Sequence, residues 1–264
     1  MNLKSNLSKS LLVLLTFLLF YLISRVPLVP YDGYMRSVVG ATSTFVFPEY
    51  NIISRLFREI LSLIFPAITI GLIAGWRNIL DAWGLAKDFF KGWLIGIIFT
   101  IPMFVGNLIF GSVDFSWDIF FLKAIFPGLF EELIYRGFLF GLLFRYCGWG
   151  FVWAAIPAAV AFTIGHFYQA HDFVSAVLVF TVTALGSILF SWLYTEWDYN
   201  LWVPISFHAM MDLAWSGIPI DGANTSVGNL TANIGRAIAI ILAIVLTILY
   251  KRRQGKRIFD YKIV

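Results

Sequence analysis

Two adjacent glutamates and an arginine interrupt an apolar run between Ile119 and Phe144. An ionisable side chain inside a bilayer costs about 3 kcal/mol on insertion scales, so three of them within six residues indicate a function. Glu132 and Arg136 are four residues apart, a spacing that places both on one helix face as an ion pair. Glu131 is turned by roughly 100° from Glu132 and points elsewhere. Glu131 is therefore a candidate reactive carboxylate.

Two of the three histidines also lie in apolar segments. His166 lies near the end of one segment, and His208 lies in another, four residues before Asp212. That spacing places the Asp212 carboxylate beside the imidazole of His208, where it can fix the tautomer and the ring orientation. Each histidine alone also fits a structural hydrogen bond between helices. The third histidine, His171, lies in a polar loop and is predicted to be solvated.

Three membrane segments carry, in turn, a carboxylate pair with arginine, an inward histidine and a His–Asp pair. Together these groups predict a site that holds water. In a poorly hydrated pocket, a carboxylate binds protons more readily than in water and can act as a general base. Histidines opposite it can donate hydrogen bonds to an oxyanion as it forms. These residues predict a hydrolase, and a peptide bond is the natural substrate within a membrane protein.

Zinc is the alternative to a metal-free site. Glu131, His166 and His208 form the kind of ligand set found in zinc hydrolases, but the sequence lacks the H-E-x-x-H pattern that makes such a set specific. We therefore expect no metal or other cofactor. A serine nucleophile is not favoured because G-x-S-x-G is absent, and the one cysteine, Cys147, is remote from the motifs in sequence.

The composition indicates the class of protein in which these residues occur. The chain has 264 residues, 60% hydrophobic and 13% charged, with a mean hydropathy of +0.84. Soluble proteins contain about 25% charged residues, so the chain is predicted to be a polytopic membrane protein. At this length we expect one membrane domain over residues 1–264. The net charge of +4 does not indicate nucleic-acid binding, because basic residues gather in the tail at 251–257, as in a topological anchor.

Eight apolar segments predict an all-α fold of about eight transmembrane helices, of which the fourth to the seventh form the catalytic core. The segments are Ser10–Leu28, Ile52–Trp76, Phe89–Phe110, Ile119–Phe144, Phe151–Tyr168, Phe173–Tyr194, Leu201–Ile218 and Ile234–Tyr250. The first segment resembles a signal peptide, but Ser24–Pro27 is not a small-x-small cleavage site, so we expect a retained helix. Lysines before the first helix and basic residues after the last predict that both termini are cytoplasmic.

The three polar patterns resemble those of a known family. Glu131-Glu132-x-x-x-Arg136, Phe162-x-x-x-His166 and His208-x-x-x-Asp212 are similar to the motifs EExxxR, FxxxH and HxxxN/D. These motifs define the CAAX prenyl endopeptidase and bacteriocin-processing (CPBP, or Abi) family of intramembrane proteases. They occur here in the family's order, and the resemblance covers about residues 119–216.

The resemblance implies a role for each motif residue. Glu131 would activate water with help from His166, and His208 would stabilise the oxyanion with Asp212. Glu132 and Arg136 would be a structural pair that supports the site, together with Phe162 of the second motif. Eukaryotic members typically have asparagine where this chain has Asp212, so residue 212 would either orient His208 or contact the oxyanion. The family is described both as metalloproteases and as glutamate proteases, and we favour the second.

The sequence therefore predicts an intramembrane endopeptidase acting on hydrophobic or lipidated peptides and proteins, with the lipid bilayer as its other partner and without nucleic acid. The family and the short loops predict a multi-pass protein of a prokaryotic plasma membrane. Two alternative functions are also compatible with these residues. A proton-coupled transporter could use the same polar residues as a relay, but neither an internal repeat nor paired broken helices are visible. A silent family member could act as a scaffold or immunity protein.

Overall fold

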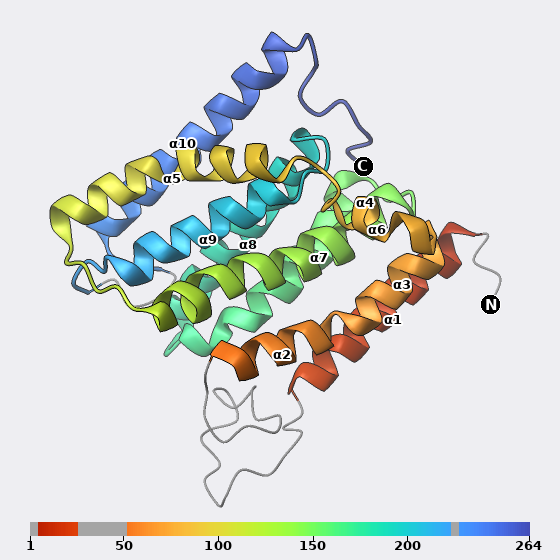
Figure 1. Cartoon of the computed structure of the whole chain (residues 1–264), viewed down its shortest axis with the longest axis horizontal. Helices are drawn as coiled ribbons and strands as arrows, with labels where there is room; N and C mark the ends of the chain where they lie inside the picture. Colours follow the sequence, from red (N-terminus) through yellow and green to blue (C-terminus); the bar gives the residue numbers. More distant parts are fainter. Residues whose placement is uncertain (1–4, 26–51, 223–226) are drawn as a thin grey trace, which may run out of the picture.

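The computed structural model describes residues 5–25, 52–222 and 227–264, which form helices joined by turns and contain no β-strand. The predicted all-helical fold is confirmed for this part of the chain (Figure 1). The predicted loop from Tyr31 to Asn51 lies outside it. The longer helices are α1 (Asn6–Arg25), α2 (Ile52–Ser62), α3 (Ile64–Ala74), α5 (Phe89–Phe110), α7 (Phe151–His166), α8 (Phe173–Glu196), α9 (Trp202–Gly217) and α10 (Leu230–Arg253).

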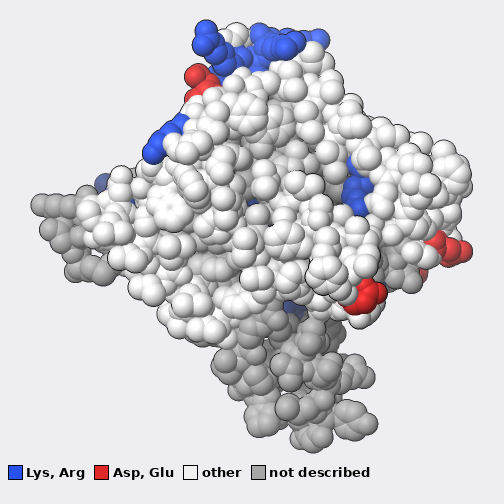
Figure 2. All heavy atoms as spheres, turned by 180° about the vertical axis from the view of Figure 1, so that it is seen from behind, with Lys and Arg blue, Asp and Glu red and all other residues white. Residues whose placement is uncertain are grey.

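The chain is an integral, multi-pass membrane protein. Five helical stretches in its described part are long and apolar enough to cross a bilayer: Arg55–Ala74, Phe89–Phe110, Phe151–Gln169, Phe173–Glu196 and Leu230–Arg253. Asn6–Leu22 of α1 is apolar but shorter. The face seen in Figure 2 is largely free of charged side chains, whereas basic side chains gather where α10 ends. The predicted total of eight spans remains a prediction.

The helices run back and forth between two ends of the molecule (Figure 1). The start of α1 and the C-terminal segment (residues 254–264) both contact the residues that lead into α7, at one of these ends. Lys9 Nζ of α1 lies 3.5 Å from the carbonyl oxygen of Tyr146, and the N–H groups of Phe151 and Val152 donate to carbonyls of the C-terminal segment at 2.9 Å. These two N–H groups open α7 and have no partner within their own helix. The C-terminal segment therefore completes the first turn of α7.

The second apolar segment contains the candidate span Arg55–Ala74, as predicted, but its helix is interrupted. It is divided at Leu63 into α2 and α3. Pro66, in the first turn of α3, has no N–H to donate to the carbonyl of Ser62, so the regular hydrogen-bond ladder cannot cross this point. The break separates the polar half of the segment, which carries Arg55 and Glu59, from its apolar half.

The fourth apolar segment is helical over the predicted range, but most of it is π-helical rather than α-helical. Its parts are η2 (Ile119–Ile125), η3 (Pro127–Phe140) and α6 (Gly141–Arg145). The N–H of Phe126 donates to the carbonyl of Phe121, five residues earlier, and the N–H of Gly141 donates to the carbonyl of Arg136. π-Helical turns are rare and occur frequently at functional sites. Here they carry the acidic motif.

Small residues bring α5 and α9 into close contact. Gly92 and Gly96 are one turn apart on α5, and they face Trp202 and Ser206 of α9. A side chain at Gly96 would meet the Ser206 hydroxyl, which itself donates to the carbonyl of Gly92 at 2.9 Å. Paired glycines of this kind allow membrane helices to approach closely. They fix the position of α9, the helix that carries the third motif.

Candidate active site

The buried carboxylate of Glu132 joins two of the motif-bearing helices. Its Oε1 atom accepts a hydrogen bond from Nη1 of Arg136 on the same helix at 2.8 Å, which is the ion pair that the i, i+4 spacing predicts. The same oxygen lies 2.7 Å from Nδ1 of His208 on α9. A carboxylate oxygen can only accept, so Nδ1 of His208 donates. Glu132 therefore holds the histidine as well as the arginine.

Two aromatic rings cover the guanidinium of Arg136. The Phe162 ring of α7 lies 4.6 Å from its central carbon, and the Phe190 ring of α8 lies 5.3 Å from it. These are cation–π distances, and the rings also exclude water from the ion pair. The arrangement explains why an aromatic residue precedes His166 by four positions. Phe190 also lies 5.4 Å from the ring of His208. Sequence reasoning missed it, because nothing distinguishes it from the other phenylalanines.

The opposite edge of the His208 ring faces two more carboxylates. Its Nε2 atom lies 3.5 Å from Oδ2 of Asp212 and 4.0 Å from Oε2 of Glu131. The side chains of Glu131 and Asp212 are 30% and 34% exposed, whereas that of Glu132 is fully buried. His208 thus separates a sealed inner carboxylate from two accessible outer ones. Asp212 lies beside His208 as the spacing predicts, but the shorter contact that fixes the ring comes from Glu132.

The ring of Phe162 lies between His166 and this cluster. The ring centroid of His166 is 4.4 Å from that of Phe162, which in turn lies 6.3 Å from the centroid of His208. Nδ1 of His166 is 2.8 Å from the carbonyl oxygen of Phe162. A carbonyl can only accept, so Nδ1 carries a proton and Nε2 of the neutral ring is an acceptor. In the described part of the chain, no hydrogen bond joins His166 to Glu131.

The remaining predicted candidates are placed as follows. His171 is exposed in the turn before α8, where its backbone N–H donates to the Ser175 hydroxyl, so its side chain is outside the cluster. Cys147 is buried in the turn after α6. Among the described residues, no three His, Cys, Asp or Glu side chains are grouped as metal ligands. The alternative zinc set of Glu131, His166 and His208 is therefore not brought together as a group of ligands in this part of the chain.

Gly128 allows the helix that carries the acidic motif to pack closely against α9. A Cβ atom at this position would lie 2.6 Å from the backbone nitrogen of Ala209 and 2.7 Å from its Cα. Real Cβ atoms do not approach backbone atoms this closely, so a side chain at Gly128 must push the two helices apart. One turn further along, the same helix carries Glu131 and Glu132, which contact His208 across this interface.

We expect Gly128→Ala to lower both stability and activity, because the backbone of α9 cannot move aside without shifting His208. Overpacking of this kind costs about 1–3 kcal/mol. Gly106→Ala on α5 is the matched control, because its nearest new contact is 3.8 Å away, an ordinary van der Waals distance. Thermal unfolding of both purified variants in detergent checks the prediction. Equal melting temperatures for the two variants would contradict the close approach of these helices.

The fold and the site define an all-helical membrane protein with a buried carboxylate–arginine–histidine cluster at its centre. Residues 112–214 match the family model described as Type II CAAX prenyl endopeptidase Rce1-like. The match includes all three motifs and confirms the family prediction made from them. Over these residues the chain is similar, in general terms, to a CAAX-type membrane protease. No curated protein and no solved structure matches the chain.

Proposed function

We propose that this protein is an intramembrane endopeptidase in which Glu131 activates a water molecule for attack on a peptide bond. The observation that carries the proposal is the placement of His208. Its inner nitrogen is fixed by Glu132 at 2.7 Å, and its outer nitrogen faces the accessible carboxylates of Glu131 and Asp212. A purely structural ion pair would require only Glu132 and Arg136, and it would not require two further carboxylates beside the same ring.

In the proposed mechanism, the Glu131 carboxylate accepts a proton from water while the water oxygen bonds to the carbonyl carbon of the peptide. The neutral His166 helps to hold the water, because its Nε2 atom is an acceptor once Nδ1 donates to Phe162. The Phe162 carbonyl fixes the tautomer, so His166 needs no carboxylate partner of its own. Glu131 then returns the proton to the departing amine nitrogen as the carbon–nitrogen bond breaks.

His208 is the proposed donor to the oxyanion. When it carries protons on both nitrogens, Nδ1 donates to Glu132 and Nε2 donates to the negative oxygen of the tetrahedral intermediate. Asp212 lies 3.5 Å from Nε2 and, as a carboxylate, attracts a proton to this atom before substrate arrives. We therefore assign Asp212 to the support of His208 rather than to a direct contact with the oxyanion. Glu132 and Arg136 hold the ring in place, and Phe162 shields their charges.

The proposed substrates are hydrophobic or lipidated peptides and proteins that reach the site from the bilayer. The motif residues lie on helices that pack among apolar membrane spans, so a substrate must partition into the membrane to approach them. The family model carries the name of a prenyl endopeptidase, which favours a peptide that bears an isoprenoid chain. We propose a prokaryotic plasma membrane as the location, with both termini on the cytoplasmic side. The basic residues Lys251, Arg252 and Arg253 in the last turn of α10 support this orientation.

Cleavage of a fluorogenic farnesylated CAAX-type peptide by purified protein tests this proposal. We expect cleavage to continue in excess chelator, because Glu131 and the histidines suffice for the proposed chemistry without a metal. The control is a known zinc protease in the same buffer, which must lose its activity. Loss of cleavage on chelation, with recovery on added zinc, would contradict the metal-free mechanism. A mixed library of hydrophobic peptides extends the assay if the lipid is not required.

A further inference from the structure

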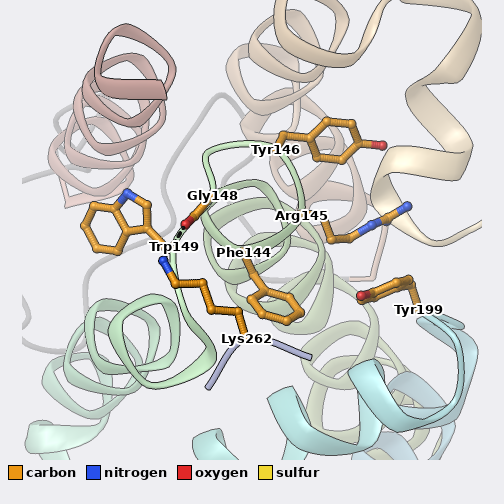
Figure 3. Close-up of a pocket in the computed structure, with 7 residues that line it drawn as sticks. All are labelled: Phe144, Arg145, Tyr146, Gly148, Trp149, Tyr199 and Lys262. Carbon is orange, nitrogen blue, oxygen red and sulfur yellow. Dashed lines mark hydrogen bonds between the residues drawn. The ribbon is translucent and has the colours of Figure 1, made fainter. Parts of the chain in front are cut away.

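A second polar site lies away from the catalytic motifs, at the end of the molecule where α1 begins and the C-terminal segment docks. It is an open pocket of about 450 Å³ beside the turn that joins α6 to α7 (Figure 3). Aromatic rings from Phe144, Tyr146, Trp149 and Tyr199 line it. Its cationic side chains are Arg145 and Lys262. The proposed peptidase mechanism uses none of these residues.

Two lysines converge on the turn at the edge of this pocket. Lys262 Nζ lies 3.4 Å from the carbonyl oxygen of Gly148, and Figure 3 shows its side chain extending toward that carbonyl beside Trp149. Lys9 Nζ lies 3.5 Å from the carbonyl oxygen of Tyr146, two residues earlier. In the described part of the chain, neither lysine is within ion-pair distance of a carboxylate. Each ammonium has three N–H groups and uses one on the turn, so both retain donors for an anion.

Arg145 builds the wall of the pocket rather than serving as its anion receptor. Its guanidinium donates to the carbonyls of Asp81 and Ala82 at 3.1 and 2.9 Å and pairs with the Asp81 carboxylate at 3.4 Å. Its central carbon lies 4.4 Å from the ring of Tyr199 and 5.3 Å from that of Tyr146. In Figure 3 it points away from Lys262, between these two tyrosines. Arg145 therefore fixes the two rings, and the positive charge left for a ligand comes from the lysines.

The position of the pocket indicates what kind of anion it meets. The turn ends where the candidate span Phe151–Gln169 begins, and Tyr199 follows the end of the candidate span Phe173–Glu196. Both facts place the pocket at the boundary between the apolar belt and water. Trp149 lies on this boundary with its indole N–H donating to the Ser10 hydroxyl at 2.9 Å. Tryptophan and tyrosine are enriched at this depth, where lipid headgroups lie.

We propose that Lys9, Lys262 and the turn Tyr146–Trp149 form a binding site for the phosphate of an acidic phospholipid. The ammonium groups pair with the headgroup phosphate, and the surrounding rings contact the glycerol and the first acyl carbons. Basic pockets between membrane helices at headgroup depth bind acidic lipids in this way. An acidic lipid is favoured over a soluble phosphate because the aromatic walls adjoin the bilayer. A bound phospholipid would hold the start of α1 and the C-terminal segment against the start of α7.

The test is lipid binding to the full chain purified in a neutral detergent and measured by native mass spectrometry. Phosphatidylglycerol is compared with phosphatidylcholine and with inorganic phosphate. Each lysine contributes about 1 kcal/mol to the attraction of an acidic headgroup, which corresponds to roughly fivefold in the dissociation constant. We therefore expect Lys262→Gln or Lys9→Gln to weaken phosphatidylglycerol binding roughly fivefold, and the double variant to weaken it about 25-fold.

Arg253→Gln is the matched control, because it removes one positive charge from an exposed position at the end of α10. It should leave the dissociation constant unchanged, and Lys262→Arg should restore it because the charge is kept. A melting temperature measured without lipid identifies any variant that fails to fold, in which case the singly substituted proteins decide the result. The lipid site is overturned if the double variant binds phosphatidylglycerol as tightly as the wild type, or if Arg253→Gln weakens binding equally. Inorganic phosphate binding as strongly as the lipid would also overturn it.

Discussion

Glu131→Gln is expected to abolish peptide cleavage while leaving the fold intact. Glutamine has nearly the same shape as glutamate but cannot accept a proton from water, and a positioned general base contributes roughly 10²–10⁴-fold to a rate. The side chain of Glu131 is 30% exposed, and its contact with His208 is 4.0 Å long. A substitution at such a position changes stability by about 0.5 kcal/mol or less. Cleavage rates and melting temperatures of the purified variant and the wild type measure both effects.

Asp221→Asn is the control for Glu131→Gln, because it also neutralises a carboxylate, at an exposed position outside the helices. It should cleave at the wild-type rate. If Glu131→Gln retained more than a tenth of the wild-type rate, Glu131 would not be the general base, and Asp212 would become the candidate because it faces the same nitrogen of His208. His166→Ala should also lower the rate, since its proposed role is to hold the attacking water.

Arg136→Met is expected to cause the largest loss of stability among the site substitutions. It removes the positive partner of Glu132 at a place where both side chains are fully buried, at 0% exposure. Breaking a buried ion pair by removing one partner costs about 3–5 kcal/mol. The Glu132 carboxylate would then stay buried with only the hydrogen bond from His208 to compensate its charge. Methionine is a long apolar side chain that can still reach the rings of Phe162 and Phe190, which contact the guanidinium in the wild type. Thermal unfolding in detergent should show a large drop in melting temperature.

Two further variants separate charge from packing in this test. Lys256→Met removes a cation from an exposed ion pair with Asp198, 2.9 Å long, and should cost at most about 1 kcal/mol. Glu132→Gln combined with Arg136→Met should recover part of the lost stability, because no charge then remains buried without a partner. If Arg136→Met were as stable as Lys256→Met, the buried pair would contribute no more to the fold than the exposed pair. A double variant less stable than the single one would mean that packing, and not charge, holds the site.

Local sequence patterns predicted the features that depend on nearby residues. The range Phe89–Phe110 is the same in the prediction and in α5, because an apolar run and its flanking turns determine it. The Glu132–Arg136 ion pair follows from helical spacing alone. The predicted helix start was less accurate where a capping residue extends a helix into polar residues. Here α10 begins at Leu230, four residues before the predicted start, because the side chain of Asn229 accepts a hydrogen bond from the N–H of Ala232.

Features that depend on contacts between distant segments could not be read from the sequence. The hydrogen bond from His208 to Glu132 joins residues 76 positions apart, and no spacing rule relates them. Phe190 belongs to the site because α8 packs beside Arg136, and the sequence does not indicate this packing. The approach of Gly128 to Ala209 likewise requires the placement of two helices. The π-helical turns of the acidic motif were missed because their sequence fits an α-helix equally well.

The central claim is that this chain hydrolyses a peptide bond with Glu131 as the base. It is tested most directly by the mass spectrum of a farnesylated CAAX-type peptide incubated with purified protein in excess chelator. We predict two product fragments, whose masses sum to that of the peptide plus one water, from the wild type, and intact peptide from Glu131→Gln. Fragments formed at equal rates by both proteins would contradict the account, because the cleavage would then not depend on this carboxylate.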